Sequence, residues 1–436
     1  MRYIGIIILL VLCLTLLLFT GCRINTDKPE TASGNLENQE DINQSSNNFQ
    51  SSSTNNSQGS STGLVYETVI ADTEETVTVY PQQWATGTGT AENPWANDCI
   101  NKALDFVPTG GTIDLKAGYY TLSTLLYINK TVNIIGEGRN KSIIVLGMTD
   151  TQGIYMHGQN YITLKGFTID GDTQIDGKKY ISPISIGNCD YITLEDIEVM
   201  NSGYYGINAY QLNHSSFRNI YLHDNYREGI HPASDIAGRN KYNTYRDIYA
   251  WNNGFCGFND RGNGEAGLPI EECYNVYDNI QAWDNTTSGI LIAYQKCTNI
   301  SNCYASGNGS VGMYLASLED SNISNCVMTL NGVIKEQQAI FLASSKNINI
   351  TNVIAKNNYT GIAIEDCSNI ALISCQSYDD RDTPLQRFGL ELTKTNTDIS
   401  LLNCKLTPNS LGKIYNPAGV VITVITEKRE FLFLLL

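Results

Sequence analysis

The sequence has little of what several common protein classes need. Basic residues are few, since 28 Lys and Arg stand against 44 Asp and Glu and leave a net charge of −16. A nucleic-acid partner is therefore not expected, because phosphate binding requires a basic surface. No Cys-x-x-Cys pair occurs among the 12 cysteines, so a structural zinc site has little support. Only 4 histidines are present, so a histidine within a regular pattern stands out.

Long apolar runs are also missing, except at the N-terminus. There Arg2 is followed by an apolar run over 4–19 and then by Thr20, Gly21 and Cys22. The segment 1–22 has the form of a secretory signal, and its end resembles the lipobox of bacterial lipoproteins. This resemblance implies a lipid anchor at Cys22 and an extracytoplasmic, membrane-anchored location. The alternative is an ordinary signal peptide with an incidental cysteine.

Residues 23–64 contain too few apolar side chains to fold on their own, because Ser, Asn, Gln and Thr dominate them. We expect a flexible tether here, followed by a folded domain over 65–436. The C-terminal EFLFLLL is apolar but too short to span a bilayer.

One pattern recurs through the middle of the chain. Segments such as YITLKGFTIDG, YITLEDIEVMN and NVYDNIQAWDN repeat at intervals of about 22–32 residues. Apolar residues alternate within each segment, which indicates strands rather than a helix. A second short strand follows in each unit, as in YGINAY, EGIHPAS and SGILIAY. The pattern predicts an all-β fold, a right-handed parallel β-helix in which each coil pairs with the next.

Other features of the sequence fit this fold. Cysteines fall in columns, and we predict that they pack as small buried groups rather than form disulfides. A helix over about 93–107, beginning at Asn93-Pro94, would cover the apolar end of the first coil. Asparagines recur at one turn position, where their amides can bond to one another, namely Asn225, Asn253, Asn285, Asn308, Asn331 and Asn358.

The asparagine column, the repeats and the entry segments ATGTGTAENPW and NIIGEGRNKSIIV resemble the pectate-lyase superfamily of β-helix proteins. The resemblance covers about residues 78–410 and is one of architecture. It implies a carbohydrate-active protein, since members of that superfamily are mostly polysaccharide lyases, hydrolases and uronate epimerases. The partner implied is a polysaccharide, and we expect the domain to be a monomer.

The second strand departs from its pattern in adjacent coils. Later coils have apolar residues at the outward position where the middle coils have Asn208, His231 and Asn259. The next inward position holds Asp260, which must be paired if it lies in the core, because an isolated buried carboxylate costs several kcal/mol. The same coils carry long inserts, PASDIAGRNKYN and RGNGEAGLPIEE. These features together predict a binding groove.

We predict that this groove holds the functional site. The catalytic candidates can move a proton or hold an anion, and they are His231, Asp260, Arg261, Tyr210 and Glu228. The substrate-binding candidates line or rim the groove, and they are Asn208, Asn259, Asp235, Arg239, Glu265, Trp251 and Tyr205. No cofactor is required by the pattern, although Ca²⁺ at Asp170, Asp172 and Asp176 is an open alternative.

These residues suit more than one reaction. For β-elimination at a uronate, Arg261 and the two asparagines would hold the carboxylate, His231 would be the base and Tyr210 the acid. For hydrolysis, Asp260 would act with Glu228 or Asp235. Mannuronan epimerases carry a Tyr-Gly-Phe-Asp-Pro-His-like segment, to which residues 228–233 are similar in the glycine, the apolar residue and the proline, but not in the tyrosine, the aspartate or the final histidine.

We therefore expect a polysaccharide lyase acting on an acidic polymer, with a hydrolase or an epimerase as alternatives. The alternative from another class is a non-catalytic glycan-binding or adhesin protein, because the many aromatic residues in the repeats could stack on sugar rings.

Overall fold

The computed structural model describes residues 77–148, 152–172, 182–262, 269–332 and 336–425. The predicted lipidation site Cys22, the tether 23–64 and the candidates Glu265 and Asp176 lie outside these ranges. No helix among the residues that the structure describes is long and apolar enough to cross a membrane.

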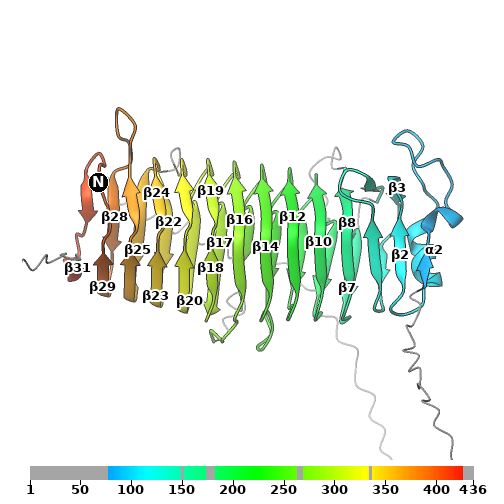
Figure 1. Cartoon of the computed structure of the whole chain (residues 1–436), viewed down its shortest axis with the longest axis horizontal. Helices are drawn as coiled ribbons and strands as arrows, with labels where there is room; N and C mark the ends of the chain where they lie inside the picture. Colours follow the sequence, from blue (N-terminus) through cyan, green and yellow to red (C-terminus); the bar gives the residue numbers. More distant parts are fainter. Residues whose placement is uncertain (1–76, 149–151, 173–181, 263–268, 333–335, 426–436) are drawn as a thin grey trace, which may run out of the picture. The chain divides into compact units, whose positions relative to one another are not determined.

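The described residues wind as a parallel β-solenoid with three faces, each coil lying beside the next (Figure 1). The first face consists of β4 (Leu126–Ile128), β7 (Ile154–His157), β9 (Ile184–Gly187), β11 (Ile207–Tyr210), β13 (Ile230–Ala233), β15 (Phe258–Asp260), β17 (Ile290–Lys296), the start of β20 (Met313–Ser324), β22 (Gln338–Ala343), β25 (Thr360–Glu365), β28 (Phe388–Thr393) and β30 (Gly412–Tyr415). The predicted all-β solenoid is confirmed.

The second and third faces share several long strands. The second face consists of β1 (Thr78–Val79), β2 (Thr112–Leu115), β5 (Asn133–Gly136), the first halves of β8 (Thr163–Asp170), β10 (Thr193–Met200), β12 (Ser216–His223), β14 (Thr244–Trp251) and β16 (Val276–Trp283), then β18 (Asn299–Ser301), the end of β20, β23 (Lys346–Thr351), β26 (Ser368–Ile373), β29 (Thr397–Leu402) and β31 (Ile422–Ile425). The third face consists of β3 (Gly118–Leu122), β6 (Ser142–Leu146), the second halves of the long strands, β19 (Tyr304–Ser306), β21 (Val327–Thr329), β24 (Ile354–Lys356) and β27 (Gln376–Tyr378).

The long strands bend where one face meets the next. At each bend one residue has a left-handed backbone, for example Asp196, Asn219 and Asp247 with φ of 54°, 56° and 56°. Asn, Asp and Gly tolerate this conformation better than other residues, which explains their recurrence at this position.

The alignment of the repeats is confirmed residue by residue. On the first face Ile230 pairs in register with Ile207 and Phe258, and all three are fully buried. In the long strands Ile197 pairs with Phe167 in the same way. Because side chains alternate along a strand, residues one position further on have the opposite orientation and face outward. The scaffold therefore presents regular columns of outward side chains.

The asparagine column forms a continuous hydrogen-bonded ladder inside the turn. Each side-chain amide donates to the amide oxygen of the next coil over distances of 2.9–3.2 Å, in the order Asn225, Asn253, Asn285, Asn308, Asn331 and Asn358. Each oxygen also accepts the backbone N–H of the previous rung, as Oδ1 of Asn285 does from Asn253 at 3.1 Å. The ladder satisfies turn groups that are buried away from water.

Replacing Asn285 with alanine is expected to lower the free energy of unfolding by about 2–4 kcal/mol, because buried donors and acceptors lose their partners. Nδ2 of Asn285 donates to the carbonyl of Ala250 and to Oδ1 of Asn308, and the side chain is nearly fully buried. Urea unfolding followed by circular dichroism measures the loss. The matched control is Asn349→Ala, since Asn349 lies on an exposed outer position, and a loss as large there would contradict this explanation.

The predicted cap helix is present but shorter than expected. The sequence predicted a start at Asn93-Pro94, but helix α2 (Cys99–Phe106) begins several residues later. Asn97 and Asp98 have left-handed backbones, with φ of 67° and 50°, which prevent an earlier start. The short η1 (Pro81–Trp84) precedes it, and α2 packs against β2 and β4 at the first coil.

Cysteines in the described part of the chain are free thiols, and most are buried. Sγ of Cys303 and of Cys326 lies 3.2 Å and 3.1 Å from the carbonyl oxygen two residues earlier, and each thiol donates to it. Within these residues the predicted packing of the cysteine columns is confirmed.

Candidate functional site

His231 lies on β13 and occupies an outward position of the first face. It pairs in register with Asn208 of β11. Its ring stacks on that of Tyr205, with centroids 4.7 Å apart and an interplanar angle of 19°, and it hydrogen-bonds to the backbone of Asn259. Only 6% of the residue is exposed, so His231 forms the floor of the site rather than its rim.

Burial lowers the pKa of His231 to about 3, and the charges of Arg261 and Arg227 act in the same direction. The imidazole is therefore neutral at neutral pH. A neutral imidazole has one ring nitrogen that can accept a proton. An anion bound beside the two guanidinium groups would oppose their part of the shift.

Glu228 lies in the turn before β13 and is fully buried. Nδ2 of Asn259 donates to Oε1 of Glu228 at 2.9 Å, and Nε of Arg227 lies 3.3 Å from Oε2. Burial raises the pKa of Glu228, although these two neighbours and Arg261 oppose the shift. A carboxyl group with a raised pKa is a candidate proton donor.

Arg261 directly follows β15 and is partly exposed. Its Nε donates to Oδ1 of Asn259 at 3.4 Å, and its charge acts on His231 and Glu228. The structure thus brings together five of the twelve predicted residues from three neighbouring coils, namely Tyr205, Glu228, His231, Asn259 and Arg261.

Asp260 has a different position from the one expected of a catalytic residue. It is fully buried on the inner side of β15, where Oδ1 accepts hydrogen bonds from Asn240 (2.9 Å), Gln295 (3.1 Å) and the backbone of Gly262 (2.8 Å). Oδ2 accepts from the Tyr277 hydroxyl at 2.6 Å. Burial raises the pKa of Asp260 to about 6, although these donors oppose the shift. These contacts are typical of a structural carboxylate whose oxygens are satisfied by hydrogen bonds.

Asn208 and Tyr210 lie on β11, in the coil before His231. Tyr210 pairs in register with Ala233, two positions beyond His231 along the strand. Both side chains are partly exposed, so they extend the site along the first face.

Asp235 and Arg239 lie in the insert after β13, and their contacts fasten that insert to the scaffold. Arg239 donates to the carbonyls of Gln211 (2.9 Å from Nε) and Cys189 (2.9 Å), and it pairs with Asp190 at 2.8 Å. The Gln211 side chain also donates to Asp235. These contacts fix the insert in place, and direct substrate binding by the two residues stays a prediction.

Trp251 ends β14 on the third face, not on the first. Its ring stacks on Trp283 at 5.0 Å and on His223 at 4.2 Å. Trp251 is therefore separated from His231 by the turn that joins the third face to the first, and the structure does not bring the two together.

Arg227 was not among the predicted site residues, although it lies at the edge of the site and contacts Glu228. Its guanidinium carbon lies 5.1–5.4 Å from the ring centroids of Tyr204, Tyr205 and Phe255. A signal was present in the sequence: two positions before the glycine of the second strand stand Tyr204, Arg227 and Phe255, whereas the next coil has Thr287. The bulky side chains at this turn position therefore occur in the coil of His231 and in the coils on either side of it.

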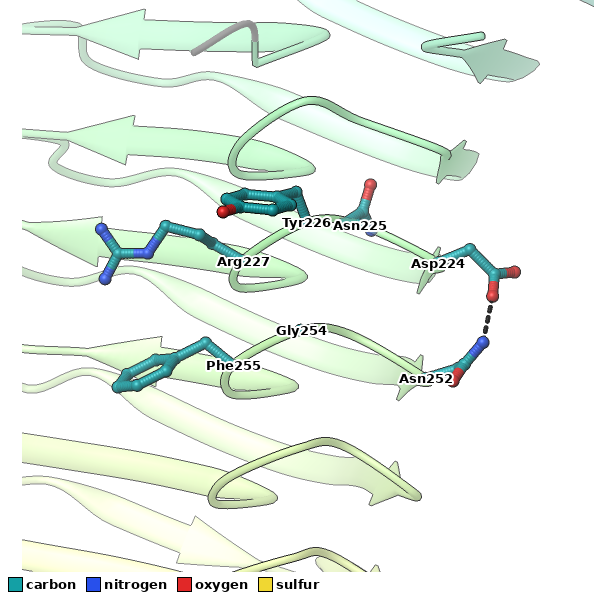
Figure 2. A pocket seen from close by; sticks show the side chains of 7 residues that line it. All are labelled: Asp224, Asn225, Tyr226, Arg227, Asn252, Gly254 and Phe255. Carbon is teal, nitrogen blue, oxygen red and sulfur yellow. Dashed lines mark hydrogen bonds between the residues drawn. The ribbon is translucent and has the colours of Figure 1, made fainter. Parts of the chain in front are cut away.

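A cleft of about 640 Å³ adjoins this edge, at the turn between the third and the first face. Figure 2 shows Arg227 and Phe255 extending to one side of two stacked turns, and Asp224 and Asn252 to the other. The remaining lining residues are Asn225, Tyr226 and Gly254.

The part of the chain that the structure describes contains no group of three or more His, Cys, Asp or Glu side chains placed to hold a metal ion. Of the calcium candidates, Asp170 accepts hydrogen bonds from the backbone of Asp172 and from the Asn201 side chain, both at 2.9 Å. The calcium alternative therefore draws no support from the described residues.

The low pKa of His231 predicts an acid-sensitive fold. The pKa is about 3 in the folded state against an ordinary value of 6.5, so this group's contribution is fully present above 6.5 and is lost as the pH falls toward 3. Between about pH 7.5 and about pH 4.5, wild-type protein should lose about 2–3 kcal/mol more unfolding free energy than His231→Gln. Urea unfolding at both pH values tests this, and equal losses in the two proteins would contradict it.

The sequence matches the family model described as "Right handed beta helix region" over residues 152–315 and 259–406. The chain belongs to the right-handed β-helix family. The predicted handedness of the solenoid is thereby confirmed. The narrower resemblance to the pectate-lyase superfamily stays a prediction.

Several solved structures are similar to this β-helix protein. The A-module of a mannuronan C-5 epimerase from Azotobacter vinelandii shares 17% identity, with 81% of this chain and 100% of that chain covered and a TM-score of 0.52. The catalytic domain of an α-1,3-glucanase in complex with tetrasaccharides shares 15%, with 73% and 65% covered and a TM-score of 0.53. The Dettilon tailspike protein shares 12%, with 78% and 68% covered and a TM-score of 0.53. At these identities the likeness establishes the fold alone. A search of curated proteins found no significant match.

Proposed function

We propose that this β-helix protein is carbohydrate-active and cleaves an acidic, uronate-containing polysaccharide by β-elimination. The observation that carries the proposal is the position of His231, a neutral imidazole on the floor of an outward-facing site, close enough to Arg261 and Arg227 for both charges to act on it. Such a site suits an anionic substrate, because a carboxylate would offset the two guanidinium charges, which add to the effect of burial in keeping the imidazole unprotonated. The carbohydrate-related neighbours of the fold agree with a saccharide ligand.

We assign the roles from the positions of these residues. Arg261, with Asn208, would hold the uronate carboxylate, which stabilises the negative charge that develops when the adjacent proton is removed. His231 would take that proton. The bond from the neighbouring ring carbon to the glycosidic oxygen then breaks, a carbon–carbon double bond forms, and Tyr210 or Glu228 would protonate the leaving oxygen.

Epimerisation is the second candidate, because the similar epimerase A-module is covered over its whole length and residues 229–232 keep part of the epimerase-like segment. Both reactions begin with removal of the same proton. They differ afterwards, since an epimerase returns a proton to the opposite side of the ring and leaves the chain intact.

Purified residues 65–436 should be incubated with mannuronate, guluronate, galacturonate and glucuronate polymers and with a neutral α-glucan. Ultraviolet absorbance detects the unsaturated ends of elimination, and NMR in heavy water detects deuterium introduced by epimerisation. Reducing ends without unsaturation would indicate hydrolysis and overturn the proposal. Binding of a polymer without any product would indicate the adhesin alternative.

The lipid anchor at Cys22 is part of the proposal, because a tethered enzyme would keep its products near the cell. Its support is the segment 19–22 and the tether that follows. Fatty-acid labelling of the full chain should be abolished in Cys22→Ser. Labelling that survives this substitution would exclude the anchor at Cys22.

A further inference from the structure

The turn cleft beside the site has the chemistry of a second sugar-binding position. Residues 224–227 and 252–255, from two successive coils, line it. It adjoins the site directly, since Nε of Arg227 lies 3.3 Å from Oε2 of Glu228, and Glu228 in turn accepts a hydrogen bond from Asn259. The guanidinium carbon of Arg227 also lies 5.4 Å from the ring centroid of Tyr205, which stacks on His231, so the cleft and His231 are close neighbours.

The cleft offers apolar ring surface to a sugar. Tyr226 is 58% exposed although it is a large aromatic residue. Gly254 occupies the neighbouring turn, where a Cβ atom would lie 2.0 Å from the carbonyl oxygen of Tyr226, so the close approach of the two turns leaves no room for a side chain there. Phe255 follows Gly254 and extends on the same side as Arg227 (Figure 2). Aromatic side chains with exposed apolar surface are common contacts in ligand pockets.

The two ends of the cleft differ in charge. At one end Nη1 of Arg227 donates to the Tyr204 hydroxyl at 2.7 Å, and Nε is paired with Glu228. A guanidinium has five N–H groups, so others remain to bind an anion. At the other end, Oδ2 of Asp224 lies 2.6 Å from Nδ1 of His223, and Asp224 accepts a hydrogen bond from Asn252. Carboxylate and amide groups of this kind bind sugar hydroxyls.

We propose that this turn cleft is a subsite that binds an acidic sugar unit next to the one on His231. The carboxylate of that unit lies against Arg227, its ring contacts Tyr226 and Phe255, and its hydroxyls face Asp224 and Asn252. The inference rests on the proposed function in one respect, namely that the polymer is acidic. It adds that affinity depends on a second carboxylate, one that takes no part in the reaction.

The test uses Tyr226→Ala and Phe255→Ala, with Tyr161→Ala as the matched control. Tyr161 is also an exposed tyrosine, 60% exposed, but it lies in the turn that follows the first face. Calorimetry with uronate oligomers of increasing length should show about tenfold weaker binding of the longer oligomers by each cleft variant, and unchanged binding of the shortest. In turnover assays KM should rise by a similar factor with kcat unchanged.

Charge is tested separately with carboxyl-reduced oligomers. Wild-type protein should bind the reduced oligomers more weakly than the acidic ones. Arg227→Gln should reduce that difference to the part that arises at Arg261, while keeping the wild-type circular dichroism spectrum. Equal binding of long oligomers by wild type and both aromatic variants would overturn the subsite. If wild type binds acidic oligomers with the predicted losses in the variants but forms no product, the subsite stands and the proposed elimination fails.

Discussion

His231→Gln is expected to lower the turnover of the acidic polysaccharide by about 10²–10⁴-fold, the usual contribution of a general base. Glutamine keeps a similar size and a hydrogen-bonding group, so it can occupy the floor of the site. It cannot accept the proton from the substrate. The rate of formation of unsaturated ends measures the effect, and binding of short oligomers should change little because Arg261 remains in place.

His214→Gln is the matched control. His214 stacks between Tyr191 and Tyr242, with centroids 5.0 Å and 4.8 Å away, in the turn that follows the first face. Its replacement should leave turnover within about twofold of wild type, since surface substitutions away from the site change little. A His231 variant that retains full turnover would remove the proposed base and with it the central argument for elimination.

Asp260→Ala is expected to lower the free energy of unfolding by about 3–5 kcal/mol, because removing one member of a buried network leaves the others without partners. The groups affected are the side chains of Asn240, Gln295 and Tyr277 and the backbone N–H of Gly262. Urea unfolding measures the loss. A loss below about 1 kcal/mol would mean that the network contributes little to stability.

Asp260→Asn separates a structural from a catalytic role. The asparagine oxygen can keep the three hydrogen bonds that Oδ1 accepts, and its amide can donate to the Tyr277 hydroxyl, which accepts as well as donates. We expect this variant to fold and to retain turnover. A large loss of turnover in a folded Asp260→Asn protein would instead support the catalytic role that the sequence predicted.

Most of the fold could be predicted because the repeat specifies it locally. Alternation along the strands decides which residues face the core, and the register of Ile207, Ile230 and Phe258 followed from aligning their glycines. The asparagine ladder could be predicted for the same reason, since a residue that recurs at one turn position must stack on its copies. The start of the cap helix could not, because it depends on the left-handed backbones of Asn97 and Asp98, which no repeat constrains.

The candidate site could be predicted only as far as strand periodicity reaches. His231, Asn208 and Asn259 were found because they interrupt apolar columns. Arg227 was not found because it lies in a turn, outside the strand pattern. Its role depends on contacts with three aromatic rings from neighbouring coils, which strand alternation does not reveal. The inner position of Asp260 was expected, but the partners that stabilise it come from three other segments of the chain.

Trp251 shows a further limit of periodicity. Alternation predicts that its side chain faces outward, and it does, but a three-faced coil has three outward directions. Only the bend at Asp247 decides that the end of β14 belongs to the third face, where Trp251 stacks on Trp283. A pattern of period two cannot distinguish the faces.

The asparagine ladder also makes the length of this protein adjustable in steps of one coil. Every inner rung receives a hydrogen bond from one neighbour and gives one to the other, as Asn308 does between Asn285 and Asn331. If one whole coil is gained or lost, the asparagines on either side of the change can therefore still hydrogen-bond to each other. Since neighbouring coils lie about 4.8 Å apart, the outward surface of the first face can lengthen or shorten by that step, while the residues around His231 stay unchanged.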